Sequence, residues 1–179
     1  MQARTRQRIE EAVAGLLSLP EGRRRPVPVE EIARALEIRV VFLPLEGNDD
    51  LSGYFMRQGA DQLIGVNSSH PRVRQRFTVA HELGHALLDQ GDGIHFDQTF
   101  RLRDARSGEG IDADEIHANA FAASLLMPES DLVAELESGV DITDDSSLRM
   151  LARKLGVSVQ ALVNRLDGLG WNVDGKAAF

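Results

Sequence analysis

Five consecutive residues carry the clearest chemical signal in this sequence: His81, Glu82, Leu83, Gly84 and His85. In a helix, a spacing of four residues brings both histidine rings onto one face, one turn apart, where they can bind a single metal ion. The Glu82 carboxylate is then placed to take a proton from a water molecule that the ion activates. The motif therefore predicts a metal-dependent hydrolase and is typical of zinc peptidases.

The residues around this motif favour a buried helix over about residues 72–89. Pro71 marks its beginning, and apolar or small residues then recur at helical spacing. A solvent-exposed amphipathic helix with two surface histidines is the alternative, but the small and apolar neighbours of the histidines suit a buried position better. Gly84 has a helix propensity about 1 kcal/mol worse than alanine, which predicts tight packing at this point.

Two histidines leave such a site one protein ligand short, because catalytic zinc sites have three protein ligands and leave the fourth position to water. The metzincin continuation needs Gly and His at fixed positions, where this chain has Leu88 and Gly91, so that class is excluded. The gluzincin arrangement takes a glutamate from a second helix. Glu115 fits it, and Asn119, one turn later on the same face, could orient a ligand histidine.

Spacing alone leaves other roles open for these acidic residues. Glu115 stands three residues after Asp112, which matches a capping box at a helix start and would make Glu115 structural. Asp89, one turn after the second histidine, is a rival oxygen ligand or a hydrogen-bonding partner of a ligand. His117 is rotated about 200° from Glu115 around a helix, so it is predicted to lie off the site.

Composition narrows the class of protein. A chain of 179 residues predicts one domain, or one with a small appendage. Its net charge of -8 argues against broad nucleic-acid binding, which relies on Lys and Arg. Cysteine is absent, so a metal must be held by histidines and carboxylates, in keeping with a reducing cytosol. No apolar run approaches the roughly 20 residues of a membrane span. We therefore expect a cytoplasmic protein without membrane association.

The element pattern predicts an α+β fold, with a small antiparallel or mixed sheet packed on a zincin-like helix pair and a C-terminal helical appendage. We expect an N-terminal helix and basic linker over 1–25, a metallopeptidase core over 26–130 and a helical segment over 131–179. Residues 90–111 are predicted to form a mobile loop that could gate the site. Expected helices cover 4–19, 29–36, 72–89, 112–127, 129–138, 146–155 and 158–169, and expected strands cover 38–43, 52–57 and 62–66.

The C-terminal segment has a pattern similar to a helix-turn-helix over 148–166, with a turn at Gly156 and a helix cap at Ser158. A helix that reads DNA should present Arg, Lys, Asn or Gln to base edges. This one offers Gln160, Asn164 and Arg165 and is otherwise apolar. We expect it to pack or to dock a partner, and we do not expect direct DNA binding.

Two long stretches carry a family resemblance. Residues 74–80 (RQRFTVA) running into the histidine motif, and residues 115–128 with the pattern ExxANxFAAxLLMP, resemble the ImmA/IrrE family of metallopeptidases. The likeness covers about residues 26–130. It implies Glu115 as the third ligand beside His81 and His85, and Glu82 as the general base. Zn²⁺ is the expected ion, with Mn²⁺ as the alternative.

The resemblance does not identify a donor that stabilises the oxyanion. Tyr54, His70 and His95 are candidates by residue type, and a packing or surface role is the alternative for each. The strand near residues 63–67 could present an edge to which a substrate peptide adds as another strand, or it could be buried inside the sheet.

Members of the resembled family cleave helix-turn-helix repressors, which switches on mobile-element or stress genes. The resemblance thus implies a repressor encoded nearby as the protein substrate, cut at a specific bond. The rival hypothesis is a non-catalytic binding module of the same fold, for example in a toxin–antitoxin pair. Glu82 favours the enzyme, because a module that only binds has no need of this carboxylate.

Overall fold

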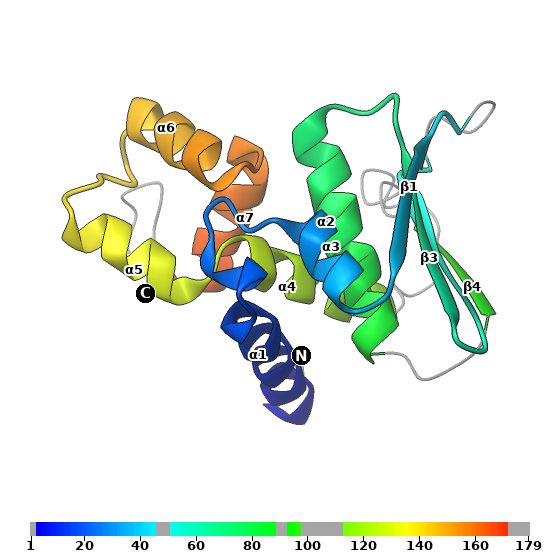
Figure 1. The fold of residues 1–179 in the computed structure, drawn as a ribbon. Helices are drawn as coiled ribbons and strands as arrows, with labels where there is room; N and C mark the ends of the chain where they lie inside the picture. The colour runs from blue at the N-terminus through cyan, green and yellow to red at the C-terminus, as the bar shows by residue number, and fades with distance from the viewer. Residues whose placement is uncertain (1–2, 46–50, 89–92, 98–112, 172–179) are drawn as a thin grey trace.

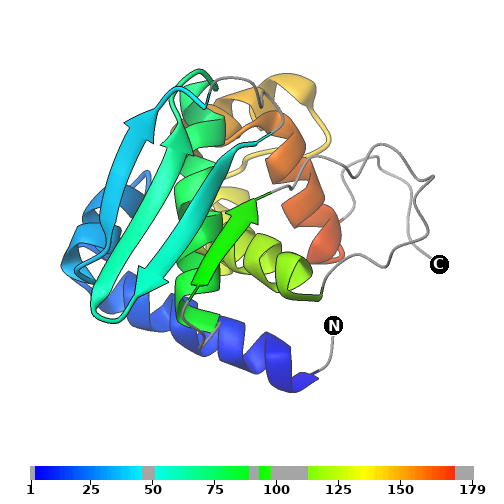
Figure 2. The ribbon, with the colours of Figure 1, turned by 90° about the vertical axis from the view of Figure 1, so that its right-hand side faces the viewer.

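Helices and a small sheet form two layers, and the α+β expectation is confirmed. The computed structural model describes residues 3–45, 51–88, 93–97 and 113–171. Within these residues, all the helices lie on one side of the sheet (Figure 1, Figure 2). The helical elements are α1 (Ala3–Ser18), the short turn η1 (Glu21–Arg23), α2 (Val29–Ala35), α3 (Arg72–Leu88), α4 (Ala113–Leu126), α5 (Glu129–Glu137), α6 (Asp145–Leu155) and α7 (Val159–Gly168). The strands are β1 (Arg39–Leu43), β2 (Gly53–Gln58), β3 (Asp61–Asn67) and β4 (Gly93–Asp97).

The four strands form a mixed sheet in the order β1-β3-β2-β4. β3 pairs with β1 in parallel and with β2 in antiparallel orientation, and β4 pairs antiparallel with β2. The sequence analysis predicts an antiparallel or mixed sheet, and these pairings make it mixed. Of the two alternatives for residues 63–67, the free strand edge is wrong and the position inside the sheet is confirmed, because β3 is paired on both sides. The outermost strands of the described sheet are β1 and β4.

β4 corrects a second expectation. It lies inside residues 90–111, for which the sequence predicts a loop, yet Gly93–Asp97 pairs with β2 along its length. The remainder of that segment, and with it the question of gating, lies outside the described residues. A strand of five residues among glycines and charges has too weak a pattern to be recognised before its partner is known.

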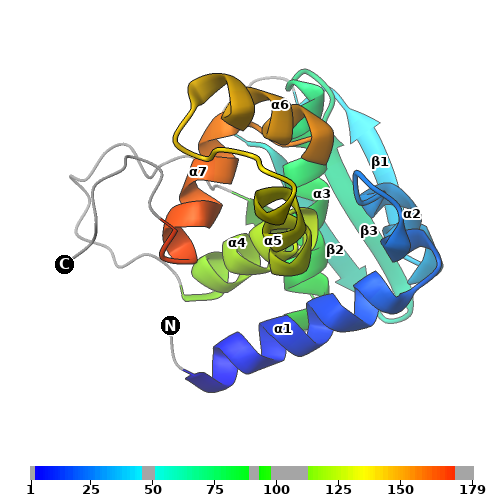
Figure 3. The same cartoon turned by 90° about the vertical axis from the view of Figure 1, so that its left-hand side faces the viewer.

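The helix α3 is the centre of the fold. Its buried side faces the inner surface of the sheet, where Phe55, Ile64 and Val66 have no exposed surface. On its other side α3 packs against α4 (Figure 3). A Cβ atom at Gly84 would lie 3.0 Å from the Ala118 Cα and 3.2 Å from the Phe121 Cδ1. The glycine therefore lets the two helices approach closely, as its low helix propensity indicates.

The C-terminal helices follow the predicted turn chemistry. Gly156 ends α6 in the left-handed region, with φ of 67°, which favours glycine. The Ser158 hydroxyl then accepts a hydrogen bond of 3.1 Å from the backbone N–H of Ala161 and begins α7. Leu162 and Leu166 have no exposed surface, so one face of α7 packs inward. Among the described residues, no helix combines the length and apolar character that crossing a membrane requires.

Candidate metal centre

Three side chains from two helices converge on one point. His81 and His85 come from α3 and Glu115 comes from α4, and each supplies a ligand atom within 4.8 Å of the others. The two Nε2 atoms are 3.1 Å apart. Glu115 Oε2 lies 3.3 Å from the His81 Nε2, and its Oε1 lies 3.4 Å from the His85 Nε2.

These distances fit a tetrahedral metal ion. Bonds of roughly 2.0–2.1 Å at tetrahedral angles place neighbouring ligand atoms about 3.4 Å apart. The donor set of two imidazoles and one carboxylate is also one that zinc accepts. The three side chains can therefore hold a divalent metal ion while leaving its fourth position open.

Burial and the neighbouring imidazoles act in opposite directions on the pKa of the Glu115 carboxyl. His81 and His85 are buried, whereas the Glu115 side chain keeps 27% of its surface exposed. Burial raises the pKa of the Glu115 carboxyl, but the hydrogen bonds and charges of the two facing imidazoles lower it further, and the resulting pKa is about 2. The carboxylate is thus ionised at neutral pH, the form in which it binds a cation.

Asn119 contacts one of the histidines from the far side. Its side-chain oxygen lies 3.2 Å from the His81 Nδ1, one helical turn after Glu115 on α4. With the amide oxygen in this orientation, Nδ1 carries the proton and donates it, so that Nε2 keeps its lone pair for an ion. Asn119 therefore lies within hydrogen-bond distance of the His81 ring, on the same helix face as Glu115.

The variant Asn119→Ala is expected to bind zinc about 10–100-fold more weakly, because the His81 ring loses the partner that holds its orientation and tautomer. Titration of the metal-free protein with a competing zinc chelator would measure the change. Asn119→Asp keeps an acceptor oxygen and should retain most of the affinity. Equal zinc affinity in the alanine variant and the unsubstituted protein would show that this contact has no part in metal binding.

Glu82 belongs to α3, and its side chain lies between this helix and the start of β2. Its side chain has no exposed surface, and it is outside the cluster of three ligands. A Cβ atom at Gly53 would lie 3.5 Å from the Glu82 Oε1, but only 2.4 Å from the Thr78 Cγ2 and 2.6 Å from the Gly65 carbonyl oxygen. Gly53 thus allows the strand to approach the carboxylate closely. A glycine inside a strand often marks a close approach of another part of the chain, so Gly53 could have been singled out from the sequence.

The variant Gly53→Ala is expected to lower the free energy of unfolding by about 1–3 kcal/mol, because the added methyl group meets Thr78 and a backbone carbonyl. Urea unfolding followed by circular dichroism would measure the loss. The matched control is Gly15→Ala in α1, where nothing lies within 4 Å of the new Cβ, so we expect a small gain from helix propensity. Equal stabilities of the two variants would contradict the close approach.

Two of the three proposed oxyanion donors, Tyr54 and His70, lie away from these residues. Tyr54 follows Gly53 in β2, so its side chain lies on the opposite face of the sheet, where its ring covers Gly65. This placement corrects the expectation for Tyr54, since Glu82 and α3 lie on the other face. His70 lies before the first turn of α3, with about 13 Å of helix between Arg72 and His81.

Three further residues from the sequence analysis complete this account. His95 stands opposite Phe55 in the pairing of β2 and β4, and its side chain is outside the described part of the structure. Asp89 also falls outside the described residues. His117 is not in the cluster, and its Nδ1 lies 4.0 Å from the Asp114 carboxylate on the same helix.

Comparison with known proteins adds independent information. Residues 33–167 match the family model of the IrrE N-terminal-like domain. The chain is 41% identical over 105 residues to the radiation response metalloprotease IrrE of Deinococcus radiodurans, an alignment that covers 58% of the chain and 30% of that protein. It is 34% identical over 131 residues to the same-named protein of Deinococcus deserti, covering 68% and 44%.

A third relative is the uncharacterized immunity region protein 2 of Bacillus phage phi105, 28% identical over 99 residues, which cover 55% of the chain and 58% of that protein. The matched region of the chain thus spans less than half the length of either IrrE protein.

Proposed function

The chain belongs to the protein family defined by the IrrE N-terminal-like domain, and we propose that it is a zinc-dependent endopeptidase. The observation that carries this proposal is the convergence of His81, His85 and Glu115 at distances that suit a tetrahedral ion. The buried Glu82 stands next to the first of these ligands in α3. Its position is the reason to propose catalysis in addition to metal binding.

The proposed mechanism assigns a task to each of these residues. A divalent ion bound here would polarise the scissile carbonyl and acidify the attacking water. Glu82 takes the proton from that water and delivers it to the leaving amine. Asn119 holds the His81 ring in the orientation that a ligand needs. Two imidazoles favour zinc over manganese, which remains the alternative ion.

The proposed substrate is a helix-turn-helix repressor encoded near this gene and cut at one specific bond. The names of the relatives, a phage immunity-region protein and two radiation response metalloproteases, fit a substrate that regulates genes. We propose that cleavage takes place in the cytoplasm, where such a regulator binds DNA. In this proposal residues 26–130, with the zincin-like pair of α3 and α4, form the peptidase core, and residues 131–179 form a helical appendage.

Incubation with the purified neighbouring regulator tests the activity. The zinc-loaded protein is expected to produce two fragments, which intact-mass spectrometry would identify. A chelator such as phenanthroline should abolish cleavage, and added zinc should restore it. Persistent cleavage after complete removal of metal would refute a metal-dependent mechanism.

A further inference from the structure

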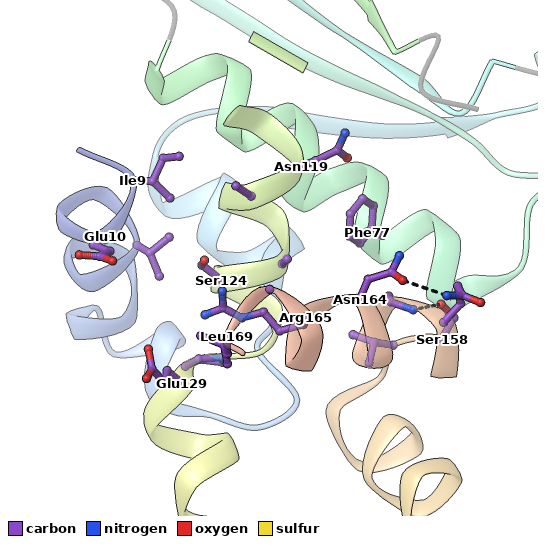
Figure 4. Close-up of a pocket in the computed structure, with 18 of the residues that line it drawn as sticks. Ile9, Glu10, Phe77, Asn119, Ser124, Glu129, Ser158, Asn164, Arg165 and Leu169 are labelled. Carbon is purple, nitrogen blue, oxygen red and sulfur yellow. Dashed lines mark hydrogen bonds between the residues drawn. The ribbon is translucent and has the colours of Figure 1, made fainter. Parts of the chain in front are cut away.

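A large cavity lies among the helices on the side of α3 that faces away from the sheet (Figure 4). Its volume is about 1140 Å³, above the roughly 300–1,000 Å³ of typical small-molecule sites. Half-buried apolar side chains line it, namely Leu17 of α1, Phe77 of α3 and Leu169, the residue that follows α7. Ala120 and Ala123 of α4 also line it, and their small side chains leave space. We call this cavity the helix groove.

The helix groove reaches the proposed active site. Asn119 lines the groove and also contacts the His81 Nδ1. Thr78 lines it as well and is the residue that a Cβ at Gly53, close to Glu82, would meet first. The groove therefore borders the proposed site at these two residues, although His81, Glu82, His85 and Glu115 do not line it. A polypeptide that lies in the groove and continues past Thr78 and Asn119 would reach the proposed site.

Residues of α7 supply a polar side to the groove. Gln160 and Asn164 are exposed, line the cavity and join through a hydrogen bond of 2.9 Å. Arg165 also lines it (Figure 4), and its Nε donates a hydrogen bond of 3.3 Å to the Met127 carbonyl oxygen. These three residues are the ones in this helix whose types are suited to contacting base edges. Because these side chains line the groove, they can contact a protein that binds there.

The shape of the groove favours a helical partner over an extended one. An extended peptide needs backbone N–H and C=O groups at a strand edge for its own hydrogen bonds. Almost all the residues that line the groove lie in helices or at their ends, where the backbone groups of the helix interior are already paired. A helix satisfies its own backbone hydrogen bonds, and the small residues Ala120 and Ala123 would let its apolar face approach closely.

We infer that the helix groove binds an amphipathic helix of the substrate protein, with its apolar face on Phe77 and α4 and its polar flank at Gln160 and Asn164. This inference rests on the proposed function, because it names the surface through which that same site selects its substrate. It gives the C-terminal helices a role in specificity. α7 forms one wall of the substrate groove, so the cleavage site depends on a helix that precedes or follows it in the substrate.

Two tryptophan substitutions on α7 test the inference. Ala161 is half-buried and lines the groove, whereas Val159 is 38% exposed and is not among the lining residues. Both are introduced into the zinc-loaded full chain that carries Glu82→Gln, so that the regulator encoded next to the gene binds without being cut. Calorimetry should show binding about tenfold weaker for Ala161→Trp, because the ring fills the groove. Val159→Trp should bind like its parent.

A milder variant controls for misfolding of the tryptophan variants. Asn164→Ala removes one polar contact at an exposed position and should weaken binding about fivefold, with zinc content and thermal transition unchanged. Equal affinities of the Ala161→Trp, Asn164→Ala and Val159→Trp proteins for the regulator would overturn the groove, and the proposed peptidase would stand if the active chain still cleaves. If the chain neither binds nor cleaves the regulator, the proposed substrate and the groove inference both fail.

Discussion

Replacing Glu82 with glutamine is expected to lower the rate of substrate cleavage by about 10²–10⁴-fold while the protein keeps its metal ion. Glutamine has nearly the same size as glutamate, so it fits the buried position between α3 and β2. It cannot accept the proton of the attacking water, and it is outside the cluster of three ligands. The variant therefore separates proton transfer from metal binding. Initial cleavage rates and zinc content per chain are the two measurements.

An exposed glutamate provides the control for this experiment. Glu137→Gln, at the end of α5, makes the same chemical change on the surface and should leave the cleavage rate unaltered. Full activity in the Glu82→Gln protein would refute the assignment of the base. The outcome for a non-catalytic binding module is different. In that case the Glu82→Gln protein and the unsubstituted protein would control a partner protein equally well, and neither would cleave it.

The second large effect is expected from removal of a ligand. Glu115→Ala and His85→Ala should each lose bound zinc on purification, because two remaining protein ligands do not complete the site. Zinc at 100 times its dissociation constant should stabilise the unsubstituted protein by about 2.7 kcal/mol. The variants should show little of this gain. Metal analysis and thermal unfolding with and without added zinc would detect the difference.

His117 offers a matched control on the same helix. His117→Ala removes an imidazole from α4, only two residues after Glu115, but from outside the cluster. It should keep both the zinc content and the zinc-dependent rise in thermal stability. If the Glu115→Ala protein binds zinc as well as the unsubstituted protein, Glu115 is not a ligand. Asp89 would then be the remaining candidate for the third ligand.

Local patterns in the sequence were sufficient for most of the elements. Helical periodicity and Pro71 predict a helix over 72–89, and α3 spans Arg72–Leu88. Gly156 and Ser158 predict the turn between α6 and α7, because left-handed backbone and helix capping each need particular residue types. The four-residue spacing in the histidine motif likewise determines that both rings share a face. These features depend on contacts within one or two helical turns.

Contacts between distant segments could not be predicted in this way. β4 pairs with β2, about 40 residues away, and β1 takes the second side of β3, so neither partner is visible in the local pattern. The alternation of faces that directs Tyr54 away from α3 also becomes clear only once the sheet is placed against this helix.

The sequence by itself thus determined the order and extent of most helices, the pair of histidines and the carboxylate beside them, since each follows from backbone geometry over a few residues. Only the tertiary structure brought Glu115 within 3.4 Å of both imidazoles and joined α1, α3, α4 and α7 around a groove. The close crossing of α3 and α4 at Gly84 decides the first of these. Helix crossings depend on packing between residues far apart in the chain, and no local pattern records their distance or angle.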